Sequence, residues 1–140
     1  MKKILSFRFG RNRCLFEQDA EVCARLADRL TNATIINADA TISAQLEEEQ
    51  VGDADFFIST SVDDEDNVMS CLQAHTLGTK NCLTIIHRAD YAAAISASGH
   101  HFGIRAAISP REATRREIQR FITTDSHHVL KKFDGIDLLE

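Results

Sequence analysis

Acids and small polar residues follow three short apolar runs, and these are the residues that could do chemistry. Glu17 directly follows one run, residues 37–41 follow a second, and Thr60 to Glu65 follow a third. In an open α/β sheet, ligands bind at the carboxyl ends of the strands. An acid after the second strand of a dinucleotide-binding sheet accepts hydrogen bonds from ribose hydroxyls. The pattern therefore points to a nucleotide site, although an acid after an apolar run is common.

Some of these residues also have a purely structural interpretation. Asp39 could accept a hydrogen bond from an adenine amino group, or it could cap the helix that follows it. The carboxylates of the stretch DFFISTSVDDEDN, residues 55–67, suit the positive end of a helix dipole. The four Cys residues include no CxxC pair, and the paired His residues have no ligands at metal spacing. We therefore predict neither a metal site nor a catalytic residue.

The elements that must position these residues alternate along the chain. Apolar runs and apolar alternation predict strands, and amphipathic or capped segments predict helices. Strands are expected at residues 4–9, 14–17, 34–37, 56–58, 82–86 and 105–108, and helices at 20–30, 42–49, 64–77, 89–98 and 110–122. This order predicts a Rossmann-like α/β fold with a mostly parallel sheet and helices on both faces.

Composition excludes some partners. The 140 residues suit one domain. The formal net charge is −5, with Lys and Arg scattered, so no nucleic-acid partner is expected. No apolar run approaches the roughly 20 residues that span a bilayer, so we expect no membrane insertion and a cytoplasmic location.

Four segments, in order and in spacing, resemble the nucleotide-binding RCK domain of the TrkA family, the cytoplasmic regulatory subunits of Trk potassium uptake systems. They are FEQDAEVCARLADRL, NADAT, DADFFISTSVDDEDNVMSCLQAHTLGTK and AISPREAT. The match looks closer to the second of the two such domains in these chains. It implies a nucleotide-binding domain at residues 13–125, after an extension or remnant at 1–12 and before a linker and further segment at 126–140.

The resemblance also implies a ligand and its contacts. NAD(H) is the expected cofactor, with ATP or ADP as an alternative. Glu17 would hold the adenosine ribose, Asp39 would lie near adenine, and Thr60 and Ser61 would line the nucleotide. Glu65 belongs to a DE-x-N pattern whose main work is to close a turn and cap a helix, with some ligand contact. The cofactor-binding residues expected in this way are Glu17, Asp39, Ala40, Thr60, Ser61 and Glu65.

The resemblance implies partners as well. The expected partner is a membrane-embedded potassium transporter subunit, bound at the inner face of the cell membrane. The chain would act as a regulatory subunit and not as an enzyme. At least a homodimer is expected.

The start of the chain departs from the family pattern. That pattern opens with a strand and a G-x-G-x-x-G loop, about 20 residues ahead of the ribose acid. Only 16 residues precede Glu17, with Gly10 as their one glycine. We therefore expect a fragment or a truncated start, without the first strand, loop and helix, and with impaired nucleotide binding. Residues 4–9 could fill the empty central position as a hairpin. Arg8 argues against that, so an exchanged dimer is favoured.

Three functions remain open at this point. The first is a regulatory nucleotide-binding domain of a potassium transporter. The second is an oligomerisation scaffold that has lost its ligand. The third, a Rossmann oxidoreductase fragment, is less favoured, because the chain has no room for a substrate domain.

Overall fold

The computed structural model describes the backbone of residues 3–7 and 13–125. Within these residues, six strands form one sheet in the order β3-β2-β1-β4-β5-β6. The strands are β1 (Lys3–Phe7), β2 (Arg13–Glu17), β3 (Ala33–Asn37), β4 (Phe56–Ser59), β5 (Cys82–Ile85) and β6 (Ile104–Ile108). The helices are α1 (Ala20–Arg29), α2 (Ser43–Glu48), α3 (Asp64–Leu77), α4 (Ala89–Ser98) and α5 (Pro110–Asp125), with short 3-10 turns at Val51–Asp53 and Gly99–Phe102.

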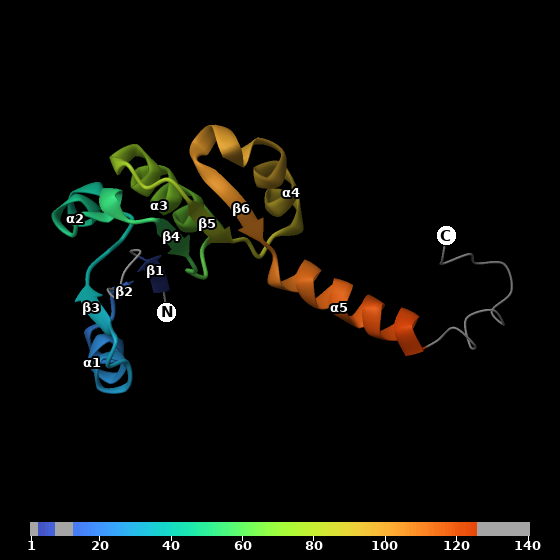
Figure 1. Ribbon diagram of the computed structural model, residues 1–140, viewed down its shortest axis with the longest axis horizontal. Coiled ribbons are helices and arrows are strands. Elements are labelled where there is room, and N and C mark those ends of the chain that lie inside the picture. Colours follow the sequence, from blue (N-terminus) through green and yellow to red (C-terminus); the bar gives the residue numbers. More distant parts are fainter. Residues whose placement is uncertain (1–2, 8–12, 126–140) are drawn as a thin grey trace, which may run out of the picture. The chain divides into compact units, whose positions relative to one another are not determined.

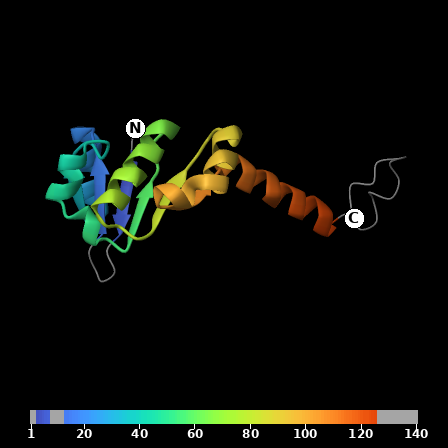
Figure 2. The same cartoon turned by 90° about the horizontal axis from the view of Figure 1, so that it is seen from above.

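The predicted fold class is confirmed. Strands β2 and β3 are parallel, and so are β4, β5 and β6. Helix α1 lies on one side of the sheet, whereas α2, α3 and α4 lie on the other (Figures 1 and 2). Asp19 caps α1 through hydrogen bonds from the N–H groups of Glu21 and Val22. Gly78 ends α3 with a φ of 127°, a conformation that favours glycine.

The central position of the sheet is filled from within the chain. Strand β1 pairs with β2 and with β4, and both pairings are antiparallel. In this register Ser6 lies opposite Cys14 on one side and Phe57 on the other. The favoured prediction, that a second copy fills this position, was wrong, and the hairpin alternative is correct. Arg8, which argued against the hairpin, lies outside the described residues.

The core lies between the sheet and α2 and α3. Alternate residues of β4 and β5 face this side, and Phe57, Ser59, Cys82 and Thr84 are fully buried. Phe16 from β2 and Leu46 from α2 join the same cluster. Packing of this kind holds the carboxyl ends of β2, β3 and β4 in fixed relation to the start of α3.

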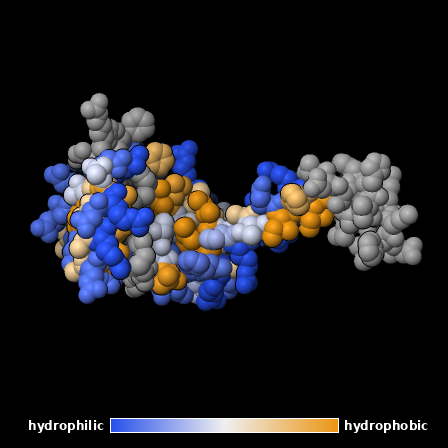
Figure 3. All heavy atoms as spheres, turned by 90° about the horizontal axis from the view of Figure 1, so that it is seen from below, coloured by the Kyte–Doolittle hydropathy of each residue, from blue (hydrophilic) through white to orange (hydrophobic). Residues whose placement is uncertain are grey.

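The opposite side of the sheet is more open. Phe56 of β4 is 36% exposed and Ile108 of β6 is 47% exposed, and both are apolar. Figure 3 views the molecule from below, opposite to the view of Figure 2, and it shows apolar atoms in patches between charged regions. This face therefore differs from the α3 side, where the strands carry fully buried side chains.

Helix α5 belongs to a second compact unit that starts at Arg111. Taken by itself, it exposes Ile118, Phe121 and Ile122. Its first turn is held by Glu112, whose carboxylate accepts hydrogen bonds from Arg115 and Arg116. Among the described residues, no helix is both long enough and apolar enough to cross a membrane.

A proline in β1 tests the central pairing. The change Ser6→Pro removes a ladder N–H from a strand paired on both sides, and it leaves a buried carbonyl without a donor. We expect the free energy of unfolding to fall by on the order of 2 kcal/mol or more, measured by urea unfolding. Ser43→Pro is the matched control, because Ser43 is the first residue of α2, where proline is tolerated. Equal effects of the two changes would contradict the central position of β1.

Candidate functional site

Three strand ends meet at one edge of the sheet. Glu17 at the end of β2 is in register with Asn37 at the end of β3. Across β1, Lys3 lies opposite Glu17 and Ile4 lies opposite Ser59, the last residue of β4. The start of β1 therefore lies between the ends of β2 and β4. This is the edge where open α/β sheets bind ligands.

A small hollow lies at this edge. Its lining residues come from the ends of β2, β3 and β4 and from α3: Phe16, Gln18, Ala38, Asp39, Ala40, Thr41, Ser61 and Asp66. The structure thus brings together three of the predicted residues, Asp39, Ala40 and Ser61. The other three, Glu17, Thr60 and Glu65, are not part of the lining. The hollow measures about 10 Å³, which is room for roughly one water molecule.

Glu17 is buried, with 1% of its surface exposed. Its Oε1 accepts a hydrogen bond of 3.1 Å from the N–H of Asp19. Its Oε2 is also buried and has no hydrogen-bond partner in the described part of the chain. A buried acceptor without a donor costs about 1–3 kcal/mol. The carboxylate therefore has capacity for one more donor, such as a hydroxyl group.

Asn37 joins the ends of β2 and β3, a role that sequence reasoning did not assign. Its Nδ2 donates to the carbonyl oxygens of Glu17 and Gln18, at 2.9 and 2.8 Å. The N–H of Ala38 donates to the same Glu17 carbonyl at 3.2 Å. These bonds set the path of the chain where it enters the hollow.

Asp39 closes a turn and does not cap a helix. Its Oδ1 accepts from the N–H of Thr41 at 2.9 Å and from the Thr41 hydroxyl at 2.6 Å. Helix α2 begins later, after Ile42, without a side-chain cap. The helix-cap alternative for Asp39 was therefore wrong. The carbonyl of Thr41 accepts from the side chain of Gln73, which fixes this turn to α3.

Asn67 organises the turn between β4 and α3. It is fully buried, and its Oδ1 accepts from the Ser59 hydroxyl at 2.6 Å and from the Ser61 N–H at 2.7 Å. Its Nδ2 donates to the carbonyls of Ser61 and Ile85, both at 2.9 Å. All of its polar capacity is used inside the protein. Asn67 therefore positions Thr60 and Ser61 and does not itself present a group to a ligand.

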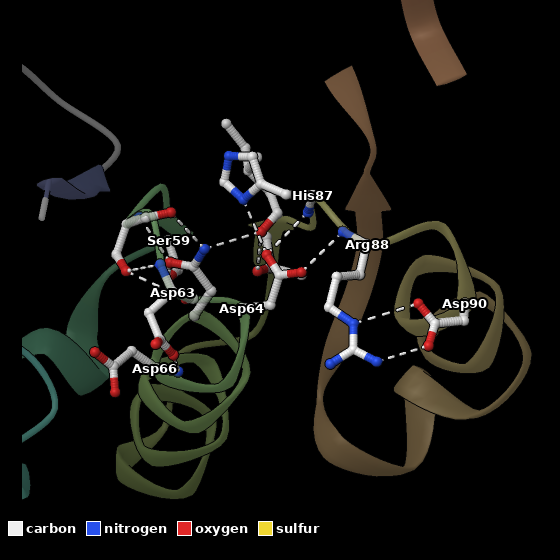
Figure 4. Close-up of polar contacts among 11 residues, drawn as sticks. Ser59, Asp63, Asp64, Asp66, His87, Arg88 and Asp90 are labelled. Carbon is white, nitrogen blue, oxygen red and sulfur yellow. Dashed lines mark hydrogen bonds and ion pairs between the residues drawn. The ribbon is translucent and has the colours of Figure 1, made fainter. Parts of the chain in front are cut away.

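The acids after this turn also serve the fold. Asp63 caps α3 by accepting from the N–H of Asp66. Asp64 accepts from the N–H of His87 at 2.8 Å, from His87 Nδ1 at 2.9 Å and from the N–H of Arg88 at 2.9 Å (Figure 4). It joins the start of α3 to the connection between β5 and α4. The Arg88 side chain pairs separately with Asp90 (Figure 4).

The environment of Asp64 shifts its pKa. Burial of the carboxyl acts to raise the pKa, but the hydrogen bonds from His87 and Arg88 outweigh burial and lower it. The neighbouring Glu65 is exposed, and its hydrogen bonding and negative charge raise the pKa of the Tyr91 phenol. Glu65 is not part of the described lining of the hollow where it was predicted to act.

The fold and this edge define a Rossmann-like α/β domain with its candidate site at the strand ends. The chain belongs to the TrkA-N domain family, whose model matches residues 6–110. It is 36% identical over 100 residues to the Trk system potassium uptake protein TrkA of Halomonas elongata, covering 71% of this chain and 21% of that protein. It is 31% identical over 121 residues to a TrkA homolog of Methanosarcina mazei, covering 86% of this chain and 29% of that protein.

A solved structure shares the fold. The NAD(P)-binding domain of an exopolyphosphatase-related protein from Archaeoglobus fulgidus has a TM-score of 0.62, with 13% sequence identity, and the match covers 78% of this chain and 77% of that one. At this identity the likeness shows the fold alone. The chain spans about a fifth to under a third of the TrkA relatives that it matches.

The role of Asn67 can be tested by an isosteric change. Asn67→Asp keeps the two acceptor contacts but replaces a double donor by an oxygen that faces two carbonyls. We expect the free energy of unfolding to fall by about 3 kcal/mol or more, measured by urea unfolding. Asn32→Asp, at an exposed position after α1, is the matched control and should change little. A comparable loss of unfolding free energy in both variants would show that the hydrogen bonds of Asn67 do not hold the turn between β4 and α3.

The pKa of Asp64 leads to a pH dependence. Because its pKa is lower in the folded protein than in the unfolded chain, ionised Asp64 stabilises the fold above the unfolded value of about 3.9. This contribution is lost as the pH falls from there through the lowered folded pKa. We expect Asp64→Asn to reduce the free energy of unfolding at pH 7 by about 1–3 kcal/mol.

The difference between Asp64→Asn and the native chain should shrink as the pH falls below about 4. Urea unfolding at pH 7, 4 and 3 measures it, with Asp28→Asn on the exposed side of α1 as the control. A difference that stays constant over this range would show that the ionisation of Asp64 is not what stabilises the connection after β5.

Proposed function

We propose that this chain is a regulatory, non-catalytic nucleotide-binding domain of a Trk-type potassium uptake system. The observation that carries the proposal is the TrkA-N match over residues 6–110, which includes all three strand ends of the site. The relatives are named as potassium uptake proteins. Asp39 and Ser61 of the lining accept hydrogen bonds that close turns. This structural use of their side chains favours a binding site over a catalytic site with a general acid and a general base.

The proposed ligand contains adenine, as NAD(H), ATP or ADP. Asp39, Ala40 and Ser61 support this assignment because they line the same hollow. Glu17 supports it through its buried Oε2, which has no hydrogen-bond partner among the described residues and which a ribose hydroxyl could satisfy. Thr60 and Glu65 remain proposed contacts, although neither is part of the described lining of the hollow.

The proposed partner is the membrane-embedded potassium transporter subunit. The domain would act from the cytoplasmic side, at the inner face of the membrane, as at least a dimer. The nucleotide-bound and nucleotide-free states of the domain would act differently on that subunit. The names of the relatives support this partner, but they describe chains several times longer than the matched region.

One observation favours a second function, a scaffold that has lost its ligand. The place of the glycine-rich loop is taken by the start of β1, and the hollow holds roughly one water molecule. Such a chain could keep an assembly role without sensing a nucleotide.

Calorimetric titration of the chain with NADH, NAD⁺ and ATP separates the two functions. If the domain binds a nucleotide, at least one of the three should bind below millimolar concentration. Glu17→Gln should weaken that binding by about tenfold, the effect of one charge-assisted hydrogen bond. Glu48→Gln, on the exposed end of α2, should leave binding unchanged.

Absence of binding by all three nucleotides, with the chain folded, would favour the scaffold. The partner is tested separately, by co-purification of the full chain with the membrane subunit of the same system. Failure to co-purify, with or without added nucleotide, would contradict the transport assignment.

A further inference from the structure

The hollow at the strand-end edge is lined mainly by two segments of the chain. Residues 38–41 belong to the loop between β3 and α2, and Ser61 and Asp66 belong to the segment where α3 begins. The hollow measures about 10 Å³. Sites that enclose ligands of nucleotide size measure about 300 Å³ or more. One of the two segments must therefore move before the site can enclose a nucleotide.

The segment that leads into α3 is firmly held by the buried side chain of Asn67. Its Oδ1 accepts from the Ser59 hydroxyl and the Ser61 N–H, and its Nδ2 donates to the carbonyls of Ser61 and Ile85. The amide has no unused donor or acceptor. Moving this segment would break several buried hydrogen bonds at once, so it is the fixed side of the hollow.

The loop between β3 and α2 is joined to α3 by Gln73, whose amide is only half satisfied. Its Nε2 donates to the carbonyl oxygen of Thr41 at 3.0 Å. Its Oε1 is buried and has no hydrogen-bond partner in the described part of the chain. A buried acceptor without a donor is costly, so it offsets part of what the donated bond contributes. When that bond opens, water can reach Oε1, and this lowers the net cost of opening.

Helix α2 allows the loop to move. The helix begins after Ile42 without a side-chain cap, and Gln45 in its first turn accepts a hydrogen bond from the N–H of Asp39. The loop and the first turn of α2 are thus joined and can move together, while the fully buried Leu46 keeps the rest of α2 on the core. Within the loop, Ala40 is 2% exposed, so opening uncovers one methyl group.

We propose that residues 38–42 form a lid over the candidate site and that Gln73 is its latch. The lid is closed in this structure, and a nucleotide is enclosed only after the hydrogen bond from Gln73 to Thr41 has opened. Gln73 therefore acts on the site through the loop and does not itself contact the ligand. The inference rests on the proposed function for the ligand that enters, whereas the movement of the lid can be measured without a ligand.

Amide hydrogen exchange on the full chain without nucleotide, followed by NMR, tests the lid. Gln73→Ala should speed exchange of the buried Ala40 N–H by about fivefold to tenfold, the effect of one lost hydrogen bond. Exchange of the Ser61 N–H, which Asn67 holds on the fixed side, should stay within about twofold. Gln73→Glu, which cannot donate to Thr41, should act in the same way. Gln119→Ala, exposed on α5, should change neither rate.

Unchanged exchange at Ala40 in both Gln73 variants would overturn the lid. Equal acceleration at Ala40 and Ser61 would also overturn it, because the whole edge would then be loosened.

Calorimetry of Gln73→Ala with NADH, NAD⁺ and ATP tests what the lid controls. The apparent affinity is reduced by the fraction of molecules that are closed, so the nucleotide that the native chain binds should bind about fivefold to tenfold more tightly. A purely structural role of Gln73 would weaken binding, and unchanged or weaker binding would overturn the inference. Absence of binding in the native chain and the variant would overturn the nucleotide part of the proposed function, whereas faster exchange at Ala40 would still support the lid.

Discussion

The structure depends on the pairing of backbone groups at the centre of the sheet. Strands β2 and β4 each need a neighbour on their inner side, because buried N–H and C=O groups without partners are costly. Strand β1 supplies those partners on both sides in antiparallel orientation. The sheet can then form within one chain, and the core against α3 can pack.

The antiparallel orientation of β1 also affects the candidate site. A parallel first strand would end at the strand-end edge and lead into a helix, whereas β1 starts there with Lys3. The proposed ribose and base contacts, Glu17 and Asp39, lie at and just after the ends of β2 and β3, but the element that normally holds the diphosphate is not part of the described edge. The acids after β4 do not replace it, since Asp63 and Asp64 are engaged in capping α3 and holding the connection after β5.

Much of this fold was predictable because local signals agreed with the tertiary arrangement. The cap at Asp19, the terminating Gly78 and the apolar runs located the helices and strands. The direction of β1 was not predictable, because alternation indicates a strand without indicating its partners. Arg8 favoured a filling from a second copy, because a charged residue is costly in a buried central strand, whereas the described strand, Lys3–Phe7, contains only residues that precede it.

The site was predicted less completely than the fold. An acid that follows a strand can be recognised, but its burial cannot, and Glu17 is almost fully buried. The role of Asp39 was ambiguous in the sequence because an aspartate side chain can either close a turn or cap a helix. Helix α2 begins only after Ile42, and Asp39 accepts a hydrogen bond from the N–H of Thr41, so its role is to close the turn. The bonds from Asn37 to residues 17 and 18 join segments distant in sequence, so no local pattern revealed them.

The central claim is that β1 occupies the middle of the sheet from within its own chain. NMR on a mixture of ¹³C-labelled and unlabelled chains tests it most directly, because isotope filtering separates contacts within a chain from contacts between chains. We expect intrachain NOEs from the backbone protons of Ser6 to those of both Cys14 and Phe57, because Ser6 lies opposite both residues. NOEs that appear only between labelled and unlabelled chains, or that fit a parallel register, would contradict it.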